Sequence, residues 1–383
     1  MLNFGIIGCG SIGGFLGRLL TRRDGELADR ARLVAVAGRN PAPVRALAAE
    51  LGCEALDVAD LLARPDVDAV VVCTPSGTHA ELGTAALEAG KHVLLEKPVD
   101  VCRDAVERLL ATARRTGRTV GVVSQRRFDP AARLARAAVR DGALGRVTSV
   151  LIEVPWWRGD AYYAGGTWRG TRALDGGGAL MNQAVQAVDL AMWLAGPVEE
   201  VAAHTALLAH HGLEVEDVAT ASLRFADGAL GALLATTAAY PGRTARIAVH
   251  GDRGSVVIDN DELAYFHAAQ DGEQATAYGA YGAGNQADAH RPSLAADGTR
   301  DSIGLLYQPH RDQLADFCDA IAAGRSPLVD AEAGRRALDV VLAVYASART
   351  GRAVRPGDTG TPVSSGTPEI PGIPGIPGKE SLS

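Results

Sequence analysis

Short apolar runs alternate with longer amphipathic segments over the first 125 residues of the chain. Runs suited to strands occur at 2–7, 33–37, 69–73, 92–95 and 119–123. Segments with apolar residues at i, i+3 and i+4 spacing predict helices at 12–23, 41–51, 79–89 and 100–116. Strands that alternate with helices are typical of a parallel sheet, so residues 1–125 are predicted to form a doubly wound, Rossmann-type α/β domain.

Beyond a predicted helix at 130–141, strand-like runs follow one another with few helices between them. These runs lie at 147–157, 198–208, 218–225, 229–239, 244–250, 255–259 and 263–267. Turn signals such as Ala226-Asp227-Gly228 favour antiparallel pairing. A helix at 179–194 interrupts the strands, and two more near 310–323 and 330–350 follow them. Residues 126–355 are therefore predicted to form an α+β domain on an open, mainly antiparallel sheet.

Two segments lack the periodicity that builds a core. Residues 356–383 are rich in Pro, Gly, Ser and Thr and are predicted to be a disordered tail. Residues 268–302 are rich in Gly, Ala and Asp and are predicted to form a long loop or a hairpin insertion.

Composition is that of an ordinary globular protein and excludes several kinds of partner. The 383 residues are 47% hydrophobic and 22% charged, which is enough to build two cores. A net charge of −7 leaves no broad basic face, so nucleic acid is not an expected partner. No apolar window long enough for a membrane helix occurs, and the N-terminus lacks the basic region of a signal peptide. The five cysteines have neither disulfide nor metal spacing, which favours a cytoplasmic protein without a metal site.

A glycine motif follows the first predicted strand. Gly8, Gly10 and Gly13 form G-x-G-x-x-G between a strand and a helix, with Ser11 and Ile12 inside the motif. In dinucleotide-binding folds the first glycine permits a tight turn and the second lets the backbone approach the pyrophosphate. The third allows close packing of helix and strand. The motif therefore predicts a site for NAD or NADP.

The end of the second strand bears on the choice of coenzyme. An acidic side chain there accepts the ribose hydroxyls of NAD, whereas a cation accommodates the 2′-phosphate of NADP. This chain has Gly38, Arg39 and Asn40 at that point. NADP is therefore predicted, with NAD as the alternative if Arg39 is only a solvated surface charge.

A lysine follows the fourth predicted strand, in the sequence Leu95-Glu96-Lys97-Pro98. Ligands of doubly wound sheets bind at the carboxyl edge of the strands, and the proline restricts the backbone of Lys97. An ammonium group at this edge can polarise a carbonyl or alkoxide oxygen and exchange its proton. Lys97 is therefore a candidate catalytic and substrate-binding residue.

Several motifs in order, from about residue 2 to 354, resemble the glucose-fructose oxidoreductase, inositol dehydrogenase and MocA family (Gfo/Idh/MocA). They are GCGSIG, CTPSGTHAE, LLEKPV, SQRRFDP, WRGTRALDGGGALMNQ and HRDQLADFCDAI. The resemblance implies an NAD(P)-dependent oxidoreductase with Lys97 as a catalytic residue that also contacts the coenzyme. It also implies that the domain of residues 126–355 binds substrate and that the protein is a homo-oligomer, associated through the open sheet of this domain. It further implies coenzyme contacts from Thr74, Pro75, Ser76, His79, Glu96 and Gln125.

One position departs from the family pattern. Many members carry D-x-x-x-H on the helix after the three glycines, and the histidine is the proposed acid/base. The matching residues here are Asn182 and Gln186, and a spacing of four puts both on one helical face. Both are predicted to lie at the catalytic centre and to contact substrate hydroxyls, but the amide of Gln186 cannot transfer a proton at neutral pH. Either Lys97 acts alone, or Tyr162, Tyr163 or His310 supplies the proton, or catalysis has been lost.

Other side chains are weaker candidates. Several aromatic residues precede the three glycines. They either stack on a sugar ring or are buried where the two domains meet. Arg169 either holds a substrate carboxylate or phosphate or forms a surface ion pair. His210 and His211 are interpreted as solvated loop residues. The predicted substrate-binding set is Lys97, Arg127, Tyr162, Trp168, Arg169, Asn182, Gln186 and His310.

The leading hypothesis is an oxidoreductase that moves hydride between NADP and a carbon of a sugar-like or cyclitol-like substrate. Two alternatives stay open. One is a family member that binds coenzyme as a sensor without turnover, and the other is a reductase of an imine or a conjugated double bond.

Overall fold

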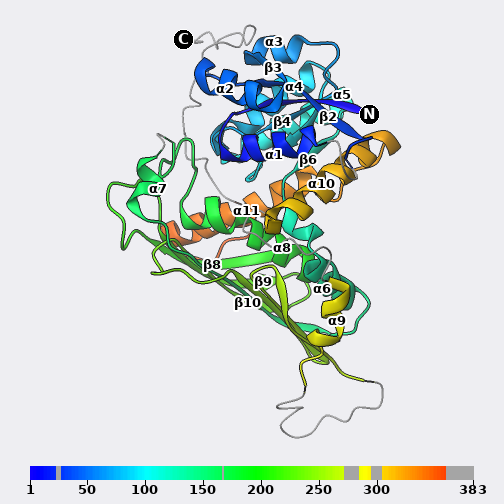
Figure 1. Ribbon diagram of the computed structural model, residues 1–383. Coiled ribbons are helices and arrows are strands. Elements are labelled where there is room, and N and C mark those ends of the chain that lie inside the picture. The colour runs from blue at the N-terminus through cyan, green and yellow to red at the C-terminus, as the bar shows by residue number, and fades with distance from the viewer. Residues whose placement is uncertain (23–26, 166–167, 271–283, 295–303, 359–383) are drawn as a thin grey trace, which may run out of the picture.

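The computed structural model describes residues 1–22, 27–165, 168–270, 284–294 and 304–358, which form two sheets with helices around and between them (Figure 1). The first sheet is parallel throughout and has the strand order β3-β2-β1-β4-β5-β6. Its strands are β1 (Leu2–Ile7), β2 (Ala31–Ala37), β3 (Glu54–Leu56), β4 (Ala69–Val72), β5 (His92–Leu95) and β6 (Val120–Val122). The predicted doubly wound domain is thereby confirmed.

Helices on both faces connect these strands. They are α1 (Ser11–Thr21), α2 (Pro41–Leu51), α3 (Val58–Ala63), α4 (His79–Glu88) and α5 (Arg103–Thr116). Local signals set their ends: Asn40 caps α2 by accepting a hydrogen bond from the N–H of Ala42, and Gly52 ends it in the left-handed region with φ +65°. Because β1 and β4 are neighbours but not consecutive, the chain reverses its winding between them. This switch point is where a doubly wound fold binds its ligand.

The second sheet has the order β13-β12-β11-β7-β10-β9-β8, and only the β7–β10 pair is parallel. The prediction of a mainly antiparallel sheet is confirmed. Along β9, buried and exposed residues alternate, because one face packs on helices and the other does not. The strands are β7 (Val147–Pro155), β8 (Val198–Ala206), β9 (Val218–Phe225), β10 (Leu230–Thr236), β11 (Arg246–Gly251), β12 (Gly254–Asp259) and β13 (Glu262–Ala268).

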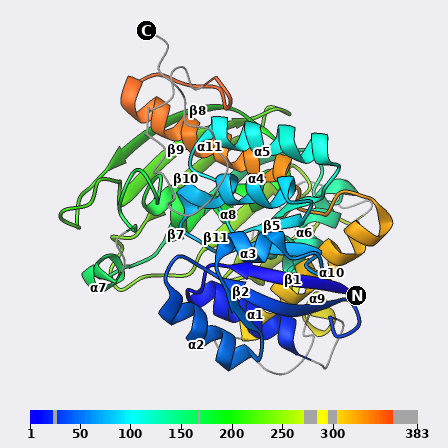
Figure 2. The same cartoon turned by 90° about the horizontal axis from the view of Figure 1, so that it is seen from above.

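The helices α6 (Pro130–Arg140), α8 (Val185–Ala195) and α11 (Ala331–Thr350) cover the inner face of the second sheet. Seen from above, α11 lies alongside α5, which connects two strands of the first sheet (Figure 2). The helix α11 therefore packs against the first domain as well as against the second sheet. The helix α10 (Gly304–Ala323) returns to the first sheet, where Phe317 lies 6.4 Å, centre to centre, from the ring of Phe4. Although α10 follows the strands of the second sheet in the chain, it packs on the first sheet.

Several predicted elements were wrong in detail. Residues 268–302 are not all loop, because α9 (Ala287–Leu294) lies within them, while 271–283 and 295–302 fall outside the described residues. The predicted helix at 179–194 is a π-type turn, η3 (Ala179–Ala184), that continues into α8. The short β3, α3, α7 (Asp160–Ala164), η1 (Ser76–Thr78) and η2 (Gln125–Phe128) were not predicted, because elements of three to six residues have too little periodicity to detect. The predicted tail from 359 onward lies outside the described residues.

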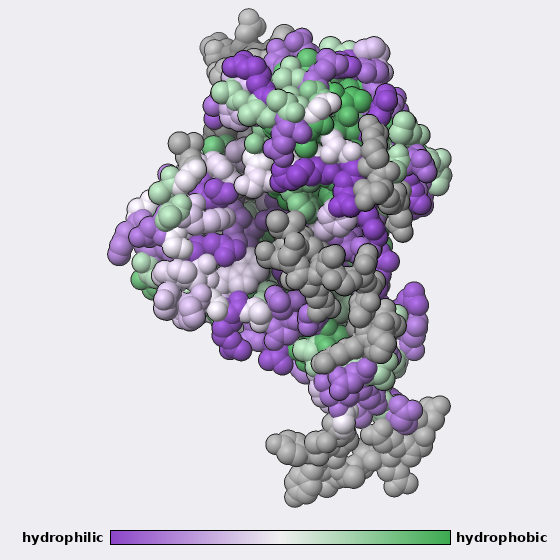
Figure 3. Space-filling view, viewed as in Figure 1, coloured by the Kyte–Doolittle hydropathy of each residue, from purple (hydrophilic) through white to green (hydrophobic). Residues whose placement is uncertain are grey.

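Over the described part of the chain, no helix is both long enough and apolar enough to cross a membrane. On the face shown in Figure 3, hydrophilic residues are interspersed with small hydrophobic areas over both layers.

Candidate active site

The glycine motif forms the turn between β1 and α1. Gly8 has φ +111°, and a Cβ there would lie 2.5 Å from the carbonyl oxygen of Cys73. A Cβ on Gly13 would lie 2.0 Å from the carbonyl oxygen of Gly8, so neither position tolerates a side chain. At Gly10 no described heavy atom lies within 4 Å of the Cβ position. Two glycines therefore allow close packing, and the third leaves the turn open toward a ligand at the N-terminus of α1, where Ser11 and Ile12 begin the helix.

Among the residues that follow β2, Asn40 forms a hydrogen bond within the protein, whereas Arg39 has no ion-pair partner among the described residues. The side chain of Asn40 caps α2, and a Cβ on Gly38 would lie 3.2 Å from a methyl group of Val44. Arg39 is exposed and forms no ion pair with any residue that the structure describes. Its guanidinium is therefore available to a phosphate at this edge.

A buried histidine joins two loops at the carboxyl edge of the sheet. The ring nitrogens of His79 lie 2.7 Å from the carbonyl oxygen of Pro98 and 2.8 Å from that of Thr74. Thr74 also accepts a 2.8 Å hydrogen bond from Thr78, within the turn that contains Pro75 and the buried Ser76. Burial lowers the pKa of His79. His79 therefore holds the turn after β4 against the Lys97-Pro98 turn rather than contacting a ligand from the surface.

Lys97 reaches from the end of β5 to the second domain. Its Nζ donates a 2.8 Å hydrogen bond to the carbonyl oxygen of Asn182, in η3. Burial lowers the pKa of the Lys97 ammonium, and the carboxylates of Glu96 and Asp175 only partly offset this effect. The neighbouring Glu96 is buried, which raises its pKa, and its Oε1 has no hydrogen-bond partner among the described residues. Both groups are thus poised for a ligand at this edge.

Asp175 is a site residue that the sequence-based prediction missed. Its Oδ1 accepts a 2.5 Å hydrogen bond from the amide of Asn182, and its Oδ2 accepts one of 2.8 Å from the N–H of Gly170. Burial raises the pKa of Asp175, and the charges of Lys97 and Arg169 oppose that rise. The signal was its place directly before the three glycines, but a carboxylate beside glycines is usually a turn residue.

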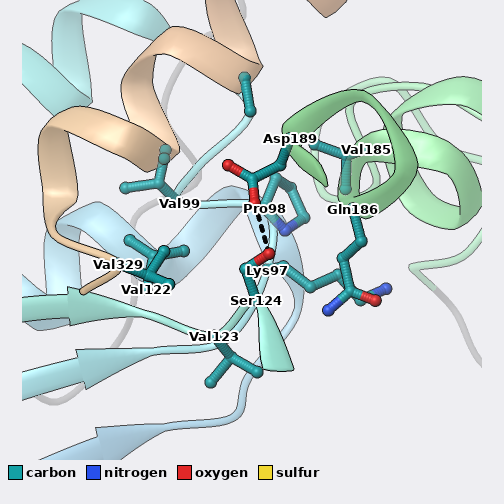
Figure 4. Close-up of a pocket in the computed structure, with 12 residues that line it drawn as sticks. Lys97, Pro98, Val99, Val122, Val123, Ser124, Val185, Gln186, Asp189 and Val329 are labelled. Carbon is teal, nitrogen blue, oxygen red and sulfur yellow. Dashed lines mark hydrogen bonds between the residues drawn. The ribbon is translucent and has the colours of Figure 1, made fainter. Parts of the chain in front are cut away.

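Gln186 faces the first domain. Its Nε2 donates a 2.6 Å hydrogen bond to Oε1 of the buried Gln125, in η2. Lys97 and Gln186 line the same small cavity (Figure 4). The structure thus brings together Lys97, Asn182 and Gln186, as the sequence predicted, and adds Gln125 and Asp175 to them.

The cavity beside Lys97 has a volume of about 20 Å³ and is lined mostly by apolar groups such as Val99, Val122 and Val185 (Figure 4). This is room for about one water molecule, whereas pockets that bind organic ligands measure roughly 300 to 1,000 Å³. The cavity is therefore the apolar backing of Lys97, not the place where a sugar binds.

Arg127 has a structural role that its sequence position did not reveal. Both it and Asp189 are buried, and two hydrogen bonds join them, one of them 2.8 Å from Nε to Oδ2. Ser124 donates a 2.5 Å hydrogen bond to the same carboxylate (Figure 4). Because its donors are committed to Asp189, the predicted substrate contact of Arg127 is not supported, and the residue joins η2 to α8 instead.

Aromatic rings and two arginines lie next to Asn182. The hydroxyl of Tyr162 accepts a 2.8 Å hydrogen bond from Gln183, whose Nε2 is also 2.8 Å from Oδ1 of Asn182. The guanidinium of Arg169 lies 4.6 Å from the ring centre of Tyr162 and 4.9 Å from that of Trp168. The second arginine, Arg158, lies over Tyr162 at 5.4 Å. Tyr162, Trp168 and Arg169 are thus placed beside the predicted site.

Two histidine predictions were wrong. His210 is buried rather than solvated, with Nδ1 3.0 Å from Asp217 and Nε2 2.6 Å from the carbonyl oxygen of Arg158. His310 lies inside α10 rather than at its start, and its ring packs edge-on against Phe15 of α1 at 5.1 Å. Its ring therefore packs between α10 and α1. The contacts with Arg158 and Phe15 join residues that are far apart in the chain, and the contact with Asp217, seven residues from His210, is made within a loop. No local pattern therefore indicated them.

The comparisons with known proteins agree with this geometry. Residues 2–124 match the model for the oxidoreductase family with an NAD-binding Rossmann fold, and residues 132–257 match the GFO/IDH/MocA C-terminal domain. The chain belongs to the Gfo/Idh/MocA oxidoreductase family. It is an NAD(P)-dependent oxidoreductase of the kind that acts on CH–OH and C=O groups.

Characterised relatives and a solved structure are similar over much of their length. The inositol 2-dehydrogenase of Rhizobium meliloti is 33% identical over 68% of this chain and 76% of its own length. The myo-inositol 2-dehydrogenase of Thermotoga maritima is 27% identical over 92% of this chain and 98% of its own. The structure of the WlbA dehydrogenase from Chromobacterium violaceum, in complex with NADH and UDP-GlcNAcA, is 31% identical and covers 92% of this chain and 95% of its own. Its TM-score is 0.79.

The described residues fit the nicotinamide dinucleotide that the family implies. Gly10 leaves the turn open where the pyrophosphate approaches, and the unpartnered Oε1 of Glu96 and the exposed Arg39 lie along the same sheet edge. No cluster of three or more His, Cys, Asp or Glu side chains suited to a metal ion occurs among the described residues.

Proposed function

We propose that this protein transfers hydride between a nicotinamide dinucleotide and a carbon of a sugar or cyclitol, with Lys97 as the group that gives or takes the proton. The observation that carries the proposal is the position of Lys97. It lies at the carboxyl edge of the coenzyme-binding sheet, and its ammonium is held 2.8 Å from the carbonyl oxygen of Asn182, in the other domain. The names of the inositol dehydrogenase relatives support the substrate class.

The side chains around Lys97 have separable tasks. The dinucleotide, when bound, supplies the hydride chemistry. Lys97 holds a proton at Nζ next to the reacting oxygen and stabilises negative charge on it. Asn182, fixed by Asp175 and Gln183, keeps the lysine directed into the site through its carbonyl oxygen and has one amide N–H left for a substrate hydroxyl. Gln186 adds an amide but no proton, because it cannot titrate, so the proton relay depends on Lys97.

We further propose that NADP is preferred over NAD. Arg39 is exposed, has no ion-pair partner among the described residues, and lies just after β2. The position before it, where an acidic side chain would accept the ribose hydroxyls of NAD, is Gly38. The KM values for NADPH and NADH test this. A lower KM for NADPH that rises in Arg39→Ala, with little change in the KM for NADH, is expected, and a preference for NADH would overturn it.

A second candidate function is a coenzyme-binding sensor. It is favoured by Gln186, which takes the place of the family's histidine and is committed to Gln125 through a 2.6 Å hydrogen bond. A screen of coenzyme oxidation against keto-sugars, cyclitol ketones and aldoses, run with both coenzymes, separates the two. Turnover of any of these that is lost in Lys97→Ala supports the enzyme, and tight coenzyme binding with no turnover across the panel supports the sensor.

A further inference from the structure

Two arginines beside the site have stacking partners but no acidic ones. Arg158 lies 4.9 Å from the ring centre of Trp156, and Arg169 lies 4.6 Å from that of Tyr162. Neither forms an ion pair with any described residue, and Nε of Arg169 is buried with no hydrogen-bond partner in the described part of the chain. Stacking on a ring fixes the plane of a guanidinium and leaves its N–H edge free, so Arg169 is held ready to donate.

Other arginines with little exposure have a definite partner. Arg127 pairs with Asp189 and Arg126 with Asp261 at 3.4 Å, while Arg136, which stacks on Trp193 without an ion pair, donates to the carbonyl oxygen of Leu194. The acidic group near Arg169 is Asp175, and both of its oxygens are already committed to Asn182 and Gly170. The whole chain carries a net charge of −7, so positive charge gathered here is local and not a general surplus.

Hydrogen bonds and one ring contact link these arginines to Asn182, which also contacts Lys97. Arg158 donates to Oε1 of Gln183 at 2.8 Å, and Nε2 of Gln183 donates to Oδ1 of Asn182, also at 2.8 Å. The carbonyl oxygen of Asn182 accepts from Lys97. Arg169 stacks on Tyr162, whose hydroxyl accepts from the same Gln183. The two guanidiniums thus flank the groups that would hold the substrate next to Lys97.

We infer that the substrate is a sugar or cyclitol that carries an anionic group, a carboxylate or a phosphate ester, and that Arg169, assisted by Arg158, binds that group. The inference rests on the proposed function and narrows its substrate class. A planar guanidinium matches both kinds of anion through paired N–H donors. Bound there, the anion supplies the acceptor that the buried Nε of Arg169 lacks and offsets the positive charge of the site.

Binding to the coenzyme-loaded protein tests the inference without requiring turnover. The probes are D-glucose, D-glucuronate and D-glucose 1-phosphate, with the corresponding galactose set, titrated by calorimetry in saturating NADPH or NADH. At least one anionic probe is expected to bind about 10-fold or more tightly than its neutral sugar, since a hydrogen bond to a charged group is worth roughly that much. A gain for the uronates assigns a carboxylate, and a gain for the sugar phosphates assigns a phosphate.

The variant Arg169→Gln is expected to remove the preference for the anion while coenzyme affinity is unchanged. The matched control is Arg172→Gln, because Arg172 is exposed and its Nε already donates to the carbonyl oxygen of Glu214 at 2.9 Å. If neither anion binds better than the neutral sugar, or if Arg169→Gln keeps the preference, the inference is wrong. Coenzyme oxidation is measured separately, so an inactive protein that still selects anions would count against the proposed function alone.

Discussion

Lys97 and Lys91 stand at opposite ends of β5 and show how position decides the role of a lysine. Nζ of Lys91 donates to the carbonyl oxygens of Arg64 and Val67, at the amino end of the strand, whereas Lys97 points into the site. We expect Lys97→Ala to lower kcat by about 10² or more, because proton transfer and charge stabilisation are both lost. Lys91→Met is the control, expected to lower Tm with kcat retained. Equal kcat in Lys97→Ala and the native enzyme would contradict the role.

The pH dependence of the reaction follows from the environment of Lys97. Burial lowers the pKa of its ammonium, so the neutral amine forms at a lower pH than in a free lysine, whose pKa is about 10.4. Oxidation of an alcohol needs the neutral amine as proton acceptor. The rate of oxidation should therefore rise with pH and level off with a midpoint below that of free lysine. Profiles of kcat against pH in the oxidative direction measure this.

The variant Gln186→His extends the same measurement. An imidazole at this position would add a group with a pKa of about 6.5 to a site where Lys97 is otherwise the only group that transfers a proton. We expect a second inflection near neutral pH in the variant and none in the native protein. A native profile that already shows such an inflection would mean that another group shares the proton transfer.

At the scale of the element, two glycines in the turn between β1 and α1 differ in the space available for a side chain. Gly13→Ala puts a methyl group 2.0 Å from the carbonyl oxygen of Gly8 and should cost about 1–3 kcal/mol of stability. In Gly10→Ala no described atom lies within 4 Å of the new methyl group, so Tm should be nearly unchanged. The methyl group instead occupies the approach of the pyrophosphate and should weaken NADH binding roughly 10-fold, about 1.4 kcal/mol. Thermal unfolding and NADH titration measure both, and a stable Gly10→Ala protein with native affinity would contradict this placement of the coenzyme.

At the scale of the whole molecule, the buried pair of Arg127 and Asp189 joins η2, which follows the last strand of the first sheet, to α8, which packs on the second sheet. Removing one partner leaves an uncompensated buried charge, so Arg127→Met is expected to lower the free energy of unfolding by about 3–5 kcal/mol. The exposed pair of Arg18 and Glu50 is the control, and Arg18→Met should cost no more than about 1 kcal/mol. Denaturant unfolding distinguishes the two, and equal small effects would show that the pair contributes little.

Self-association is the other prediction at this scale. The outer face of the second sheet carries Leu151 and Leu230, which are 41% and 57% exposed. We expect the protein to form a homo-oligomer through this face, because apolar side chains on an open sheet are stabilised by burial. Light scattering should show an oligomer for the native chain and a smaller species for Leu151→Arg. A native monomer would contradict this prediction, and the cytoplasmic location likewise stays a prediction.

The sequence by itself determined the coenzyme-binding sheet, the mainly antiparallel second sheet, the open turn at Gly10 and the position of Lys97. These depend on periodicity and on short motifs, which act between neighbours in the chain. Tertiary structure alone decided that Asp175 holds Asn182, that Gln186 pairs with Gln125, that Arg127 is bound to Asp189, and that α10 packs on the first sheet. Such pairings join residues that are distant along the chain or hidden in loops. Their partners are set by how the layers pack, which no local pattern records.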